Sequence, residues 1–134
     1  MSYIFSQVKQ SDKWAHKQYH SLLSQAELPV DQPADFVLGI YDQEYNMIAA
    51  GSLKDNQMHS IVVDLAHRGK GILNQIVTHL YEYRFYNGSG DLCVTVQNDL
   101  APLFKSLGFH EIKRPCEDTV FMGNRNALNL INGN

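Results

Sequence analysis

The pattern of apolar and polar positions predicts a mixed α/β chain. Short runs rich in β-branched and aromatic residues predict strands at residues 3–8, 36–41, 47–53, 58–63, 92–96, 109–113 and 119–122. Apolar residues at helical spacing predict helices after Ser11, from Ile72 and from Asn98. The order is strand, helix, three strands, helix, strand, helix and two strands. Because no long linker interrupts it, we expect residues 1–134 to form one domain.

The predicted helices each have a recognisable start, face or end. Ser11 is expected to cap the first helix, and residues 29–33, between two prolines, are expected to form a loop after it. Gly108 is expected to end the third helix, and residues 124–134 predict at most a short terminal helix. The core-facing residues are expected to be Ala15, Tyr19, Leu22, Leu23 and Ala26 in the first helix, Ile72, Leu73, Ile76, Val77, Leu80 and Tyr81 in the second, and Leu100, Leu103, Phe104 and Leu107 in the third.

The most informative segment follows the apolar run at residues 61–63. It contains Arg68, Gly69, Lys70 and Gly71 and leads directly into a helix. Glycines let the backbone adopt positive φ and approach a ligand closely. The helix start directs unpaired N–H groups and the positive end of the helix dipole at the same point. The segment therefore predicts an anion site, for which a phosphate is the natural ligand.

The run Arg68-Gly69-Lys70-Gly71-Ile72-Leu73 resembles motif A of the GNAT superfamily of N-acetyltransferases. The family pattern is Arg or Gln, any two residues, Gly, any residue, and then Gly or Ala. The first four positions fit, whereas Leu73 stands where the family has a small residue. The resemblance implies that the amides of residues 68–73 hold the pyrophosphate of acetyl-CoA. It also implies that backbone groups of Val62 and Val63 contact the pantetheine arm.

A second segment, residues 98–109, begins at Asn98 and ends in Gly108-Phe109. It is similar to motif B of the same superfamily, in which an Asn after a strand opens a helix that ends in Gly-Phe. Together the two motifs imply the GNAT fold, an α/β (α+β) arrangement with a mixed central sheet of about six to seven strands and helices on both faces. In that fold the fourth and fifth strands run parallel and splay apart, and Asn98 and Phe104 would contact the cofactor from the side opposite the glycine loop.

One branch of the superfamily fits better than a generic member. The runs at residues 51–53, 61–64 and 103–109 look like the N-terminal domain of citrate lyase ligase, which acetylates the thiol of an acyl carrier subunit with acetate and ATP. The ATP chemistry of that enzyme belongs to a C-terminal nucleotidyltransferase domain with a His-any-Gly-His motif, which this sequence lacks. The resemblance covers only the front part of that enzyme, so both a piece of a longer ligase and a free-standing relative stay open.

Composition and charge exclude several other classes of function. The formal net charge is −3, and a nucleic-acid binder would normally show a basic stripe. The spacing of Cys93 and Cys116 matches no zinc pattern. Cys93 is expected to be a buried thiol in a reduced setting, although a disulfide stays open. His16 and His20 lie four apart without a third ligand, so no metal is expected.

Targeting signals are also missing from the sequence. No segment reaches the roughly 20 apolar residues that span a membrane. The first eight residues have neither a charged n-region nor a long apolar core, so they do not resemble a signal peptide. We therefore expect a cytoplasmic protein without membrane or nucleic-acid partners. A homodimer is a further expectation, because exposed strand edges favour pairing between copies.

The catalytic groups are less well defined than the cofactor loop. Many family members have a Tyr acid where this chain has Phe104, and a phenyl ring donates no proton. Tyr81, Tyr83 and Tyr86 are alternative acids, although packing roles are commoner for such residues. His59 is the tentative base, and His67 is expected to border the phosphates. Aromatic residues Trp14, Tyr41 and Tyr45 can line an acceptor groove or serve as packing anchors.

Three functions follow from these observations. The leading one is an acetyl-CoA-dependent N-acetyltransferase domain that acts on a small-molecule or protein amine. The alternative is a non-catalytic domain that binds CoA or an acyl-carrier thiol, related to the front part of citrate lyase ligase and favoured by Phe104. A third is a purely structural domain without cofactor, in which bulky Leu73 crowds the pyrophosphate.

Overall fold

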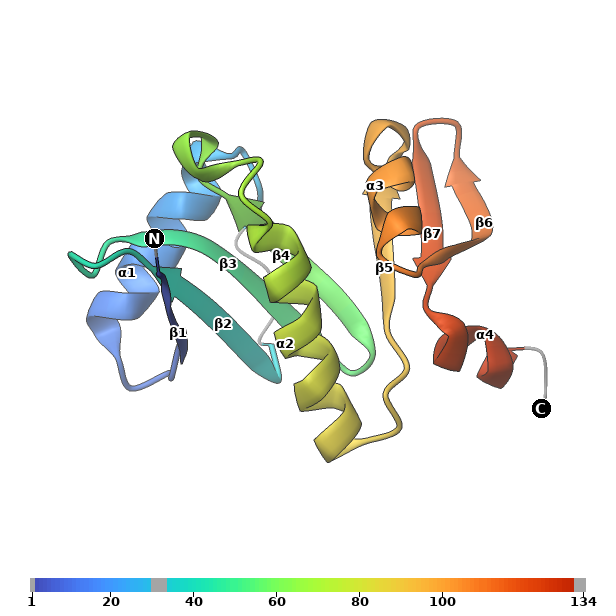
Figure 1. The fold of residues 1–134 in the computed structure, drawn as a ribbon, viewed down its shortest axis with the longest axis horizontal. Helices are drawn as coiled ribbons and strands as arrows, with labels where there is room; N and C mark the ends of the chain where they lie inside the picture. Colours follow the sequence, from blue (N-terminus) through green and yellow to red (C-terminus); the bar gives the residue numbers. More distant parts are fainter. Residues whose placement is uncertain (1, 30–33, 132–134) are drawn as a thin grey trace. The chain divides into compact units, whose positions relative to one another are not determined.

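The computed structural model describes residues 2–29 and 34–131 (Figure 1). The strands are β1 Ile4–Gln7, β2 Phe36–Tyr41, β3 Met47–Lys54, β4 Gln57–Val63, β5 Cys93–Gln97, β6 His110–Cys116 and β7 Thr119–Gly123. The helices are α1 Lys13–Gln25, α2 Ile72–Asn87, α3 Ala101–Ser106 and α4 Arg125–Ile131, with short 3₁₀ turns η1 Leu65–His67 and η2 Asn98–Leu100. The mixed sheet has seven strands in the order β1-β2-β3-β4-β5-β7-β6, as the GNAT fold implied.

The chain divides into two compact units. Unit 1 comprises Met1–Asp55 and His59–Leu80, and unit 2 comprises Asn56–Met58 and Tyr81–Asn134. In unit 1, β1 and β2 pair antiparallel from Ile4↔Tyr41, and β2 and β3 pair antiparallel from Phe36↔Leu53. This confirms the predicted strand boundaries to within one or two residues. Residues 30–33 of the loop predicted at 29–33 lie outside the described residues.

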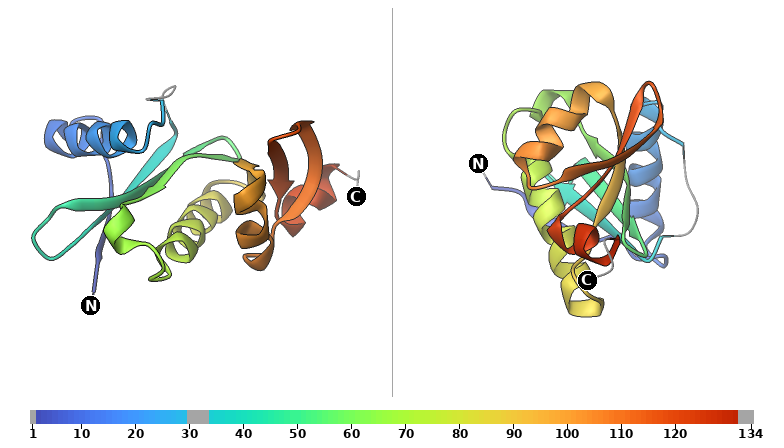
Figure 2. Two further views of the ribbon diagram at one scale, coloured as in Figure 1. Left: turned by 90° about the horizontal axis from the view of Figure 1, so that it is seen from above. Right: turned by 90° about the vertical axis from the view of Figure 1, so that its right-hand side faces the viewer.

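Helix α1 covers one face of the unit 1 sheet, and α2 covers the opposite face (Figure 2). The predicted α1 face is confirmed, since Ala15, Tyr19, Leu22 and Leu23 are buried in one cluster with residues of β2, β3 and β4. The predicted cap is wrong by one residue. Asp12, not Ser11, accepts the N–H of Ala15 at 3.0 Å. The helix begins at Lys13, so Asp12 is the residue whose short side chain reaches the third helical amide.

Helix α2 packs directly on β3, as its apolar row predicts. Ile72, Ile76 and Leu80 are almost fully buried. A Cβ added to Gly51 would lie 2.7 Å from Cγ2 of Ile76, a distance at which one of the two must move. Gly51 therefore lets the helix approach the sheet closely.

Strand β4 contains a local irregularity that changes which side chains share a face. Ser60 has a φ of +52°, a conformation unusual for a non-glycine residue and typical of a β-bulge. Residues two apart share a face in a regular strand. Here His59 lines the α1 face of unit 1 and Val62, three residues later, packs into the core on that same face. The bulge thus places His59 and Val62 on the same face of the sheet.

Unit 2 is built around β5. The start of β4 pairs parallel with β5 through Gln57↔Cys93, which confirms the predicted parallel course; the splay of the two strands stays a prediction. Strand β7 pairs antiparallel with both β5 and β6. Strand β6 runs to Cys116, three residues beyond the predicted end at residue 113, because its pairing with β7 continues to Cys116↔Thr119.

A buried carboxylate joins three segments of unit 2. Asp91, only 2% exposed, accepts hydrogen bonds from Arg84 (Nη2 at 3.0 Å) and Asn56 (Nδ2 at 2.9 Å), and from the hydroxyl of Ser89. Burial by itself would raise the pKa of Asp91, but the bonds from Ser89, Asn56 and Arg84 outweigh it and lower the pKa below its ordinary value. The network anchors the end of α2 beside β5.

The third predicted helix has a different buried face from the one expected. Leu100 and Leu103 are 44% and 45% exposed, whereas Ala101 and Phe104 are buried. The segment opens with the 3₁₀ turn η2, and three residues per turn replace 3.6 there. Within α3 the inward face consists of Ala101 and Phe104, which are three residues apart, and Leu103 lies beside it. Gly108 ends the helix with a φ of +95°, as predicted.

No helix in the described part of the chain is both long and apolar enough to cross a membrane. Cys93 is buried and Cys116 is exposed, and both are free thiols. Burial, followed by the charge of Asp91, raises the pKa of Cys93. A hydrogen bond with the hydroxyl of Thr119 lowers the pKa of Cys116.

Candidate functional site

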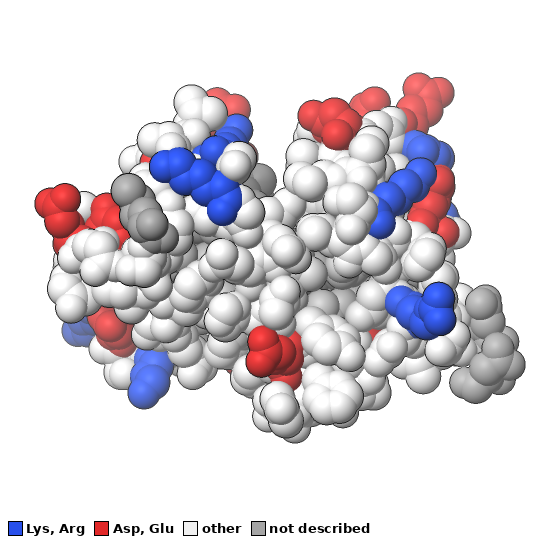
Figure 3. Space-filling view, viewed as in Figure 1, with Lys and Arg blue, Asp and Glu red and all other residues white. Residues whose placement is uncertain are grey.

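The glycine loop of unit 1 has the conformation that its sequence predicts. Gly69 and Gly71 have φ angles of +79° and +76°, and a Cβ added to either would meet nothing within 4 Å. Both flanking cations, Arg68 and Lys70, are exposed. In Figure 3 basic side chains gather over the turn between β4 and α2. The loop therefore presents an accessible backbone beside positive charge.

The start of α2 adds backbone amides beside the glycine loop. The N–H of Gln75 donates to the carbonyl of Gly71 at 3.3 Å, which places the first helical bond at the loop itself. The amides of the first helical turn, from Ile72 onward, precede that bond and have no acceptor within the helix. Ile72 is 2% exposed and anchors the turn in the core, while Leu73 is half-buried. These amides and the helix dipole favour an anion at this position.

The loop is held in place by contacts with β4 and β3. Nε of Arg68 donates to the carbonyl of Val63 at 3.1 Å, and the amide of Asp64 donates to Ile48 at 2.8 Å. The imidazole of His67 lies 3.1 Å from a carboxylate oxygen of Asp64. The carbonyl of Val63, expected to face the pantetheine arm, is thus already one partner of Arg68. His67, expected to border the phosphates, stabilises the turn through Asp64.

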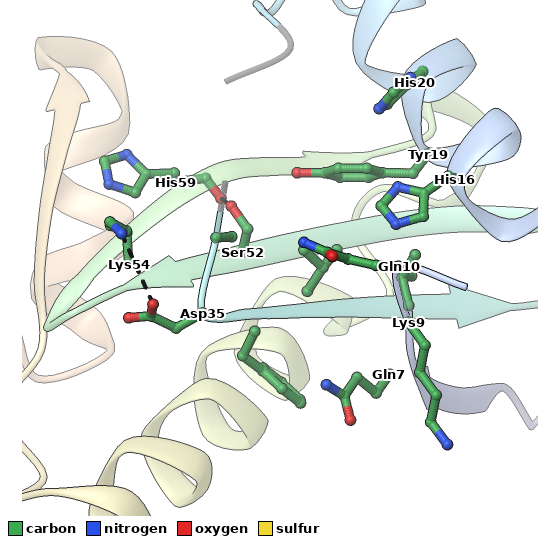
Figure 4. Close-up of a pocket in the computed structure, with 14 residues that line it drawn as sticks. Gln7, Lys9, Gln10, His16, Tyr19, His20, Asp35, Ser52, Lys54 and His59 are labelled. Atoms are coloured by element: carbon green, nitrogen blue, oxygen red, sulfur yellow. Dashed lines mark hydrogen bonds and ion pairs between the residues drawn. The ribbon is translucent and has the colours of Figure 1, made fainter. Parts of the chain in front are cut away.

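A second feature of unit 1 is a cavity of about 570 Å³ on the α1 face of the sheet, here called the α1 cavity (Figure 4). Its volume is in the range of small-molecule sites. The described residues that line it are Gln7, Val8, Lys9, Gln10, His16, Tyr19, His20, Ala34, Asp35, Phe36, Val37, Ser52, Lys54 and His59. In Figure 4, His59 and Lys54 lie toward one end, and His16 and His20 toward the other.

The tentative base His59 belongs to the lining of the α1 cavity. Its backbone carbonyl accepts the hydroxyl of buried Ser52 at 3.0 Å, which fixes the strand at this point. Its side chain is on the α1 face of the sheet, beside the bulge at Ser60. Val62 lies on the same face but is buried in the core, so only its backbone is available to a ligand.

The two predicted site residues of the second motif lie in unit 2 and have internal partners there. Nδ2 of Asn98 donates to the carbonyl of Glu117 at 2.5 Å, and Oδ1 accepts from Arg114 at 2.6 Å. Phe104 is 3% exposed and meets the ring of Phe109 edge to face, with 5.7 Å between centroids. Asn98 therefore joins η2 to the β6–β7 hairpin, and Phe104 fills the core under α3.

The remaining aromatic candidates have mostly packing environments. Tyr41 is buried and stacks with Trp14 at 6.4 Å, and burial followed by the charge of Asp12 raises its pKa. Tyr45 is exposed in the β2–β3 turn with a φ of +63°. Tyr81 and Tyr83 are half-buried, and Tyr86 is 80% exposed. None of these six side chains lines the α1 cavity.

Sequence reasoning missed the α1 cavity. Its lining comes from five segments between residues 7 and 59, and no single periodicity links them. Two signals were available, namely polar residues inside strand patterns at Ser52 and His59, and the histidine pair in α1. His16 and His20 are neighbours, with ring centroids 5.8 Å apart. Within the described residues, no three His, Cys, Asp or Glu side chains are grouped to hold a metal ion.

Comparison with solved structures finds the same fold in proteins described as acyltransferases. An acyl-CoA N-acyltransferase from Pseudomonas aeruginosa superposes with a TM-score of 0.77, at 15% identity, over 92% of this chain and 99% of that one. An aminoglycoside 6'-N-acetyltransferase complexed with coenzyme A gives a TM-score of 0.78, at 12% identity, over 90% of this chain and 96% of that one. At such identities the likeness shows the fold.

Sequence comparison identifies a relative and the family of this chain. The [citrate [pro-3S]-lyase] ligase of Haemophilus influenzae is 26% identical over 92 residues, which cover 69% of this chain and 28% of that protein. The chain thus corresponds to less than a third of the length of this relative. Residues 6–122 match the family described as the acetyltransferase (GNAT) domain. Since that match spans most of the chain and the seven-stranded fold agrees with it, the protein belongs to the acetyltransferase (GNAT) domain family.

Proposed function

We propose that this protein binds acetyl-CoA through the glycine loop and transfers its acetyl group to an amine. The observation that carries the proposal is the pair of positive-φ glycines, open to solvent, at the start of α2. The open space at Gly69 and Gly71 fits a pyrophosphate, which needs close backbone approach and positive charge. Arg68 and Lys70 supply that charge, and amides of the first turn of α2 supply donors.

The acetyl thioester of the co-substrate provides the activated acyl group. In the transfer, a C–N bond forms to the amine and the C–S bond of the thioester breaks. The amine loses a proton and the thiolate that leaves gains one, so the products are an acetamide and a free thiol. His59 is proposed as the group that accepts the amine proton, directly or through water. It lies in the α1 cavity, beside the bulge in β4.

The first experiment is calorimetric titration of acetyl-CoA into the purified protein, with desulfo-CoA and adenosine 3′,5′-bisphosphate as comparison ligands. We expect micromolar binding of acetyl-CoA and desulfo-CoA and weaker binding of the bisphosphate, which lacks the pyrophosphate. Absence of binding at millimolar acetyl-CoA would contradict the proposal. Thiol release with a panel of amines then measures transfer.

Replacing His59 tests the proposed base. We expect His59→Asn to lower kcat by about a hundredfold, the usual contribution of general base catalysis. The affinity for acetyl-CoA should stay unchanged, because His59 is outside the glycine loop. An unchanged kcat would assign the proton transfer to another group.

A second candidate function is supported by Phe104, whose buried ring has no hydroxyl to protonate a leaving thiolate. On that basis the protein would bind CoA or an acyl-carrier thiol without transferring an acetyl group to an amine. This candidate is favoured if acetyl-CoA binds but no amine in the panel causes release of the CoA thiol. Acetylation of a pantetheine thiol is compatible with it but is not required.

A further inference from the structure

Tyr19 is a side chain of the α1 cavity that the proposed transfer does not yet use. The residue is 7% exposed and belongs to the core cluster of unit 1 with Leu22 and Leu23 of the same helix. It also lines the α1 cavity, and in Figure 4 its hydroxyl is directed toward Ser52 and the end at which His59 lies. The core therefore fixes the ring, while the polar end of the side chain faces the cavity.

The hydroxyl of Tyr19 is open to a ligand. Among the described residues, the fully buried side-chain atoms that lack a hydrogen-bond partner are Oη of Tyr3 and Nε2 of His16. Oη of Tyr19 also lacks a partner among these residues but is not fully buried, so a molecule in the cavity can reach it. A phenol hydroxyl can both donate and accept a hydrogen bond. It can therefore bind a neutral polar group of a ligand.

Several other polar groups of the lining already have partners within the protein. Ser52 donates its hydroxyl to the backbone carbonyl of His59 at 3.0 Å. The ammonium of Lys54 lies 3.9 Å from a carboxylate oxygen of Asp35, so these two charges offset each other. In Figure 4 the side chain of Lys9 extends away from the cavity centre. What the described lining offers a ligand is therefore mainly neutral hydrogen bonding.

We propose that the acceptor bound in the α1 cavity is an amine that carries a second, neutral hydrogen-bonding group such as a hydroxyl. The hydroxyl of Tyr19 binds this second group, and the amino group lies at the end of the cavity where His59 accepts its proton. Because the two side chains come from α1 and β4 and lie apart in Figure 4, the two polar groups of the acceptor are separated by several bonds. The inference rests on the proposed function, since it names the substrate class of that acetyl transfer.

Pairs of amines that differ by one hydroxyl test the proposal in the native protein. Thiol release from acetyl-CoA is measured with tyramine and phenethylamine, and with pentylamine and its analogue that carries a hydroxyl on the far terminal carbon. In each pair the hydroxyl is remote from the nitrogen, so a difference in amine basicity does not explain a difference in rate. We expect kcat/KM for at least one hydroxylated amine to exceed that of its partner by about tenfold, the effect of one hydrogen bond to an otherwise unpaired group. Equal kcat/KM within both pairs overturns the proposal.

Removal of one oxygen atom from Tyr19 locates the contact. Tyr19→Phe keeps the ring in the core, so the fold and the affinity for acetyl-CoA should stay unchanged. We expect the preference for the hydroxylated amine to fall below about twofold, with little change in kcat/KM for the amine without a hydroxyl. Tyr41→Phe is the matched control and should keep the full preference, because Tyr41 is 6% exposed in the same core cluster but does not line the cavity. A preference that survives in Tyr19→Phe overturns the assignment of Tyr19.

Two readouts separate this inference from the proposed function. Calorimetry with acetyl-CoA and thiol release with any amine test the proposed function, and failure of either contradicts the transfer. Binding of the four amines to the protein without acetyl-CoA, followed by saturation-transfer NMR, tests the α1 cavity alone. Tighter binding of a hydroxylated amine to the wild type than to Tyr19→Phe supports the ligand class of the cavity even when no transfer is seen. Equal binding of all four amines to the two proteins overturns the inference.

Discussion

The glycine loop of unit 1 and the Asn98–Phe109 segment of unit 2 resemble two motifs of one family. They differ in whether their polar groups have hydrogen-bond partners within the protein. In the loop, Gly69 and Gly71 leave open space, and the first amides of α2 have no acceptor within the helix. In the segment, both polar atoms of the Asn98 side chain have protein partners and Phe104 is buried. The loop leaves backbone amides and open space at its surface, whereas the segment is satisfied by its own unit.

This difference shows that a motif has to be interpreted through its neighbours. A polar or backbone group without a partner is available to a ligand, and one with good internal bonds contributes first to stability. We therefore expect changes in the loop to alter acetyl-CoA affinity while the fold persists. Changes in the segment and around Asp91 should alter stability first.

Truncation of Phe104 should have the largest effect. We expect Phe104→Ala to lower the free energy of unfolding by about 4 kcal/mol, because it leaves a cavity beside Phe109. Urea denaturation measures the change. Leu103→Ala is the matched control on the same helix, 45% exposed, and should cost less than about 1 kcal/mol. Similar losses in both variants would mean that the Phe104 ring is not a core residue in solution.

Neutralisation of Asp91 should come next. Asp91→Asn leaves Arg84 without its buried partner and should cost about 3 kcal/mol at neutral pH. The hydrogen bonds that lower its pKa make the folded protein bind this proton less tightly than the unfolded chain does. The stabilisation is therefore complete above the ordinary value of 3.8 and is lost as pH falls through the lower folded-state value.

Denaturant titrations at several pH values check this sign. The stability difference between wild type and Asp91→Asn should shrink as the pH falls below 3.8. The exposed carboxylate Asp99 provides the control, since Asp99→Asn should change stability little at any pH. A difference that grows in acid would refute the assigned role of the network.

Substitution of Gly71 should affect ligand binding rather than the core. A β-branched residue is strained at a φ of +76° and moves the backbone away from the phosphates. We expect Gly71→Val to weaken acetyl-CoA binding about a hundredfold, equivalent to about 2.7 kcal/mol. Gly108→Val imposes similar strain at a φ of +95° in unit 2, where a Cβ also meets nothing within 4 Å. Gly108→Val should lower the stability of the protein and leave its affinity for acetyl-CoA unchanged. Equal acetyl-CoA affinities for the two variants would show that the glycine loop is not part of the binding site.

Removal of the Asn98 amide should have the smallest effect and sharpens the comparison most. Asn98→Ala breaks two exposed hydrogen bonds and should cost about 1 kcal/mol of stability. Its effect on acetyl-CoA affinity, measured by calorimetry, should be far smaller than that of Gly71→Val. An affinity loss as large as that of the glycine variant would show that Asn98 contacts the cofactor directly, as its motif implied.

Much of the fold was predictable because local patterns agree with it. The alternation at residues 36–41 predicted β2 with its correct ends, and the row from Ile72 to Leu80 predicted the buried face of α2. Errors arose where several neighbouring positions are apolar. In α3 the buried residues are Ala101 and Phe104 while Leu103 is 45% exposed, and the apolar spacing did not distinguish these neighbours.

By itself the sequence determined the order of elements, the glycine loop and its family, because these depend on residues adjacent in the chain. Backbone conformation at Gly69 and Gly71 is a local property, so a short motif specifies it. Only the tertiary structure decided that Asn98 and Phe104 have internal partners, and that His59 shares the α1 cavity with His16. Those relations need a bulge at Ser60 and segments brought together by folding, and neither leaves a periodic signal in a single sequence.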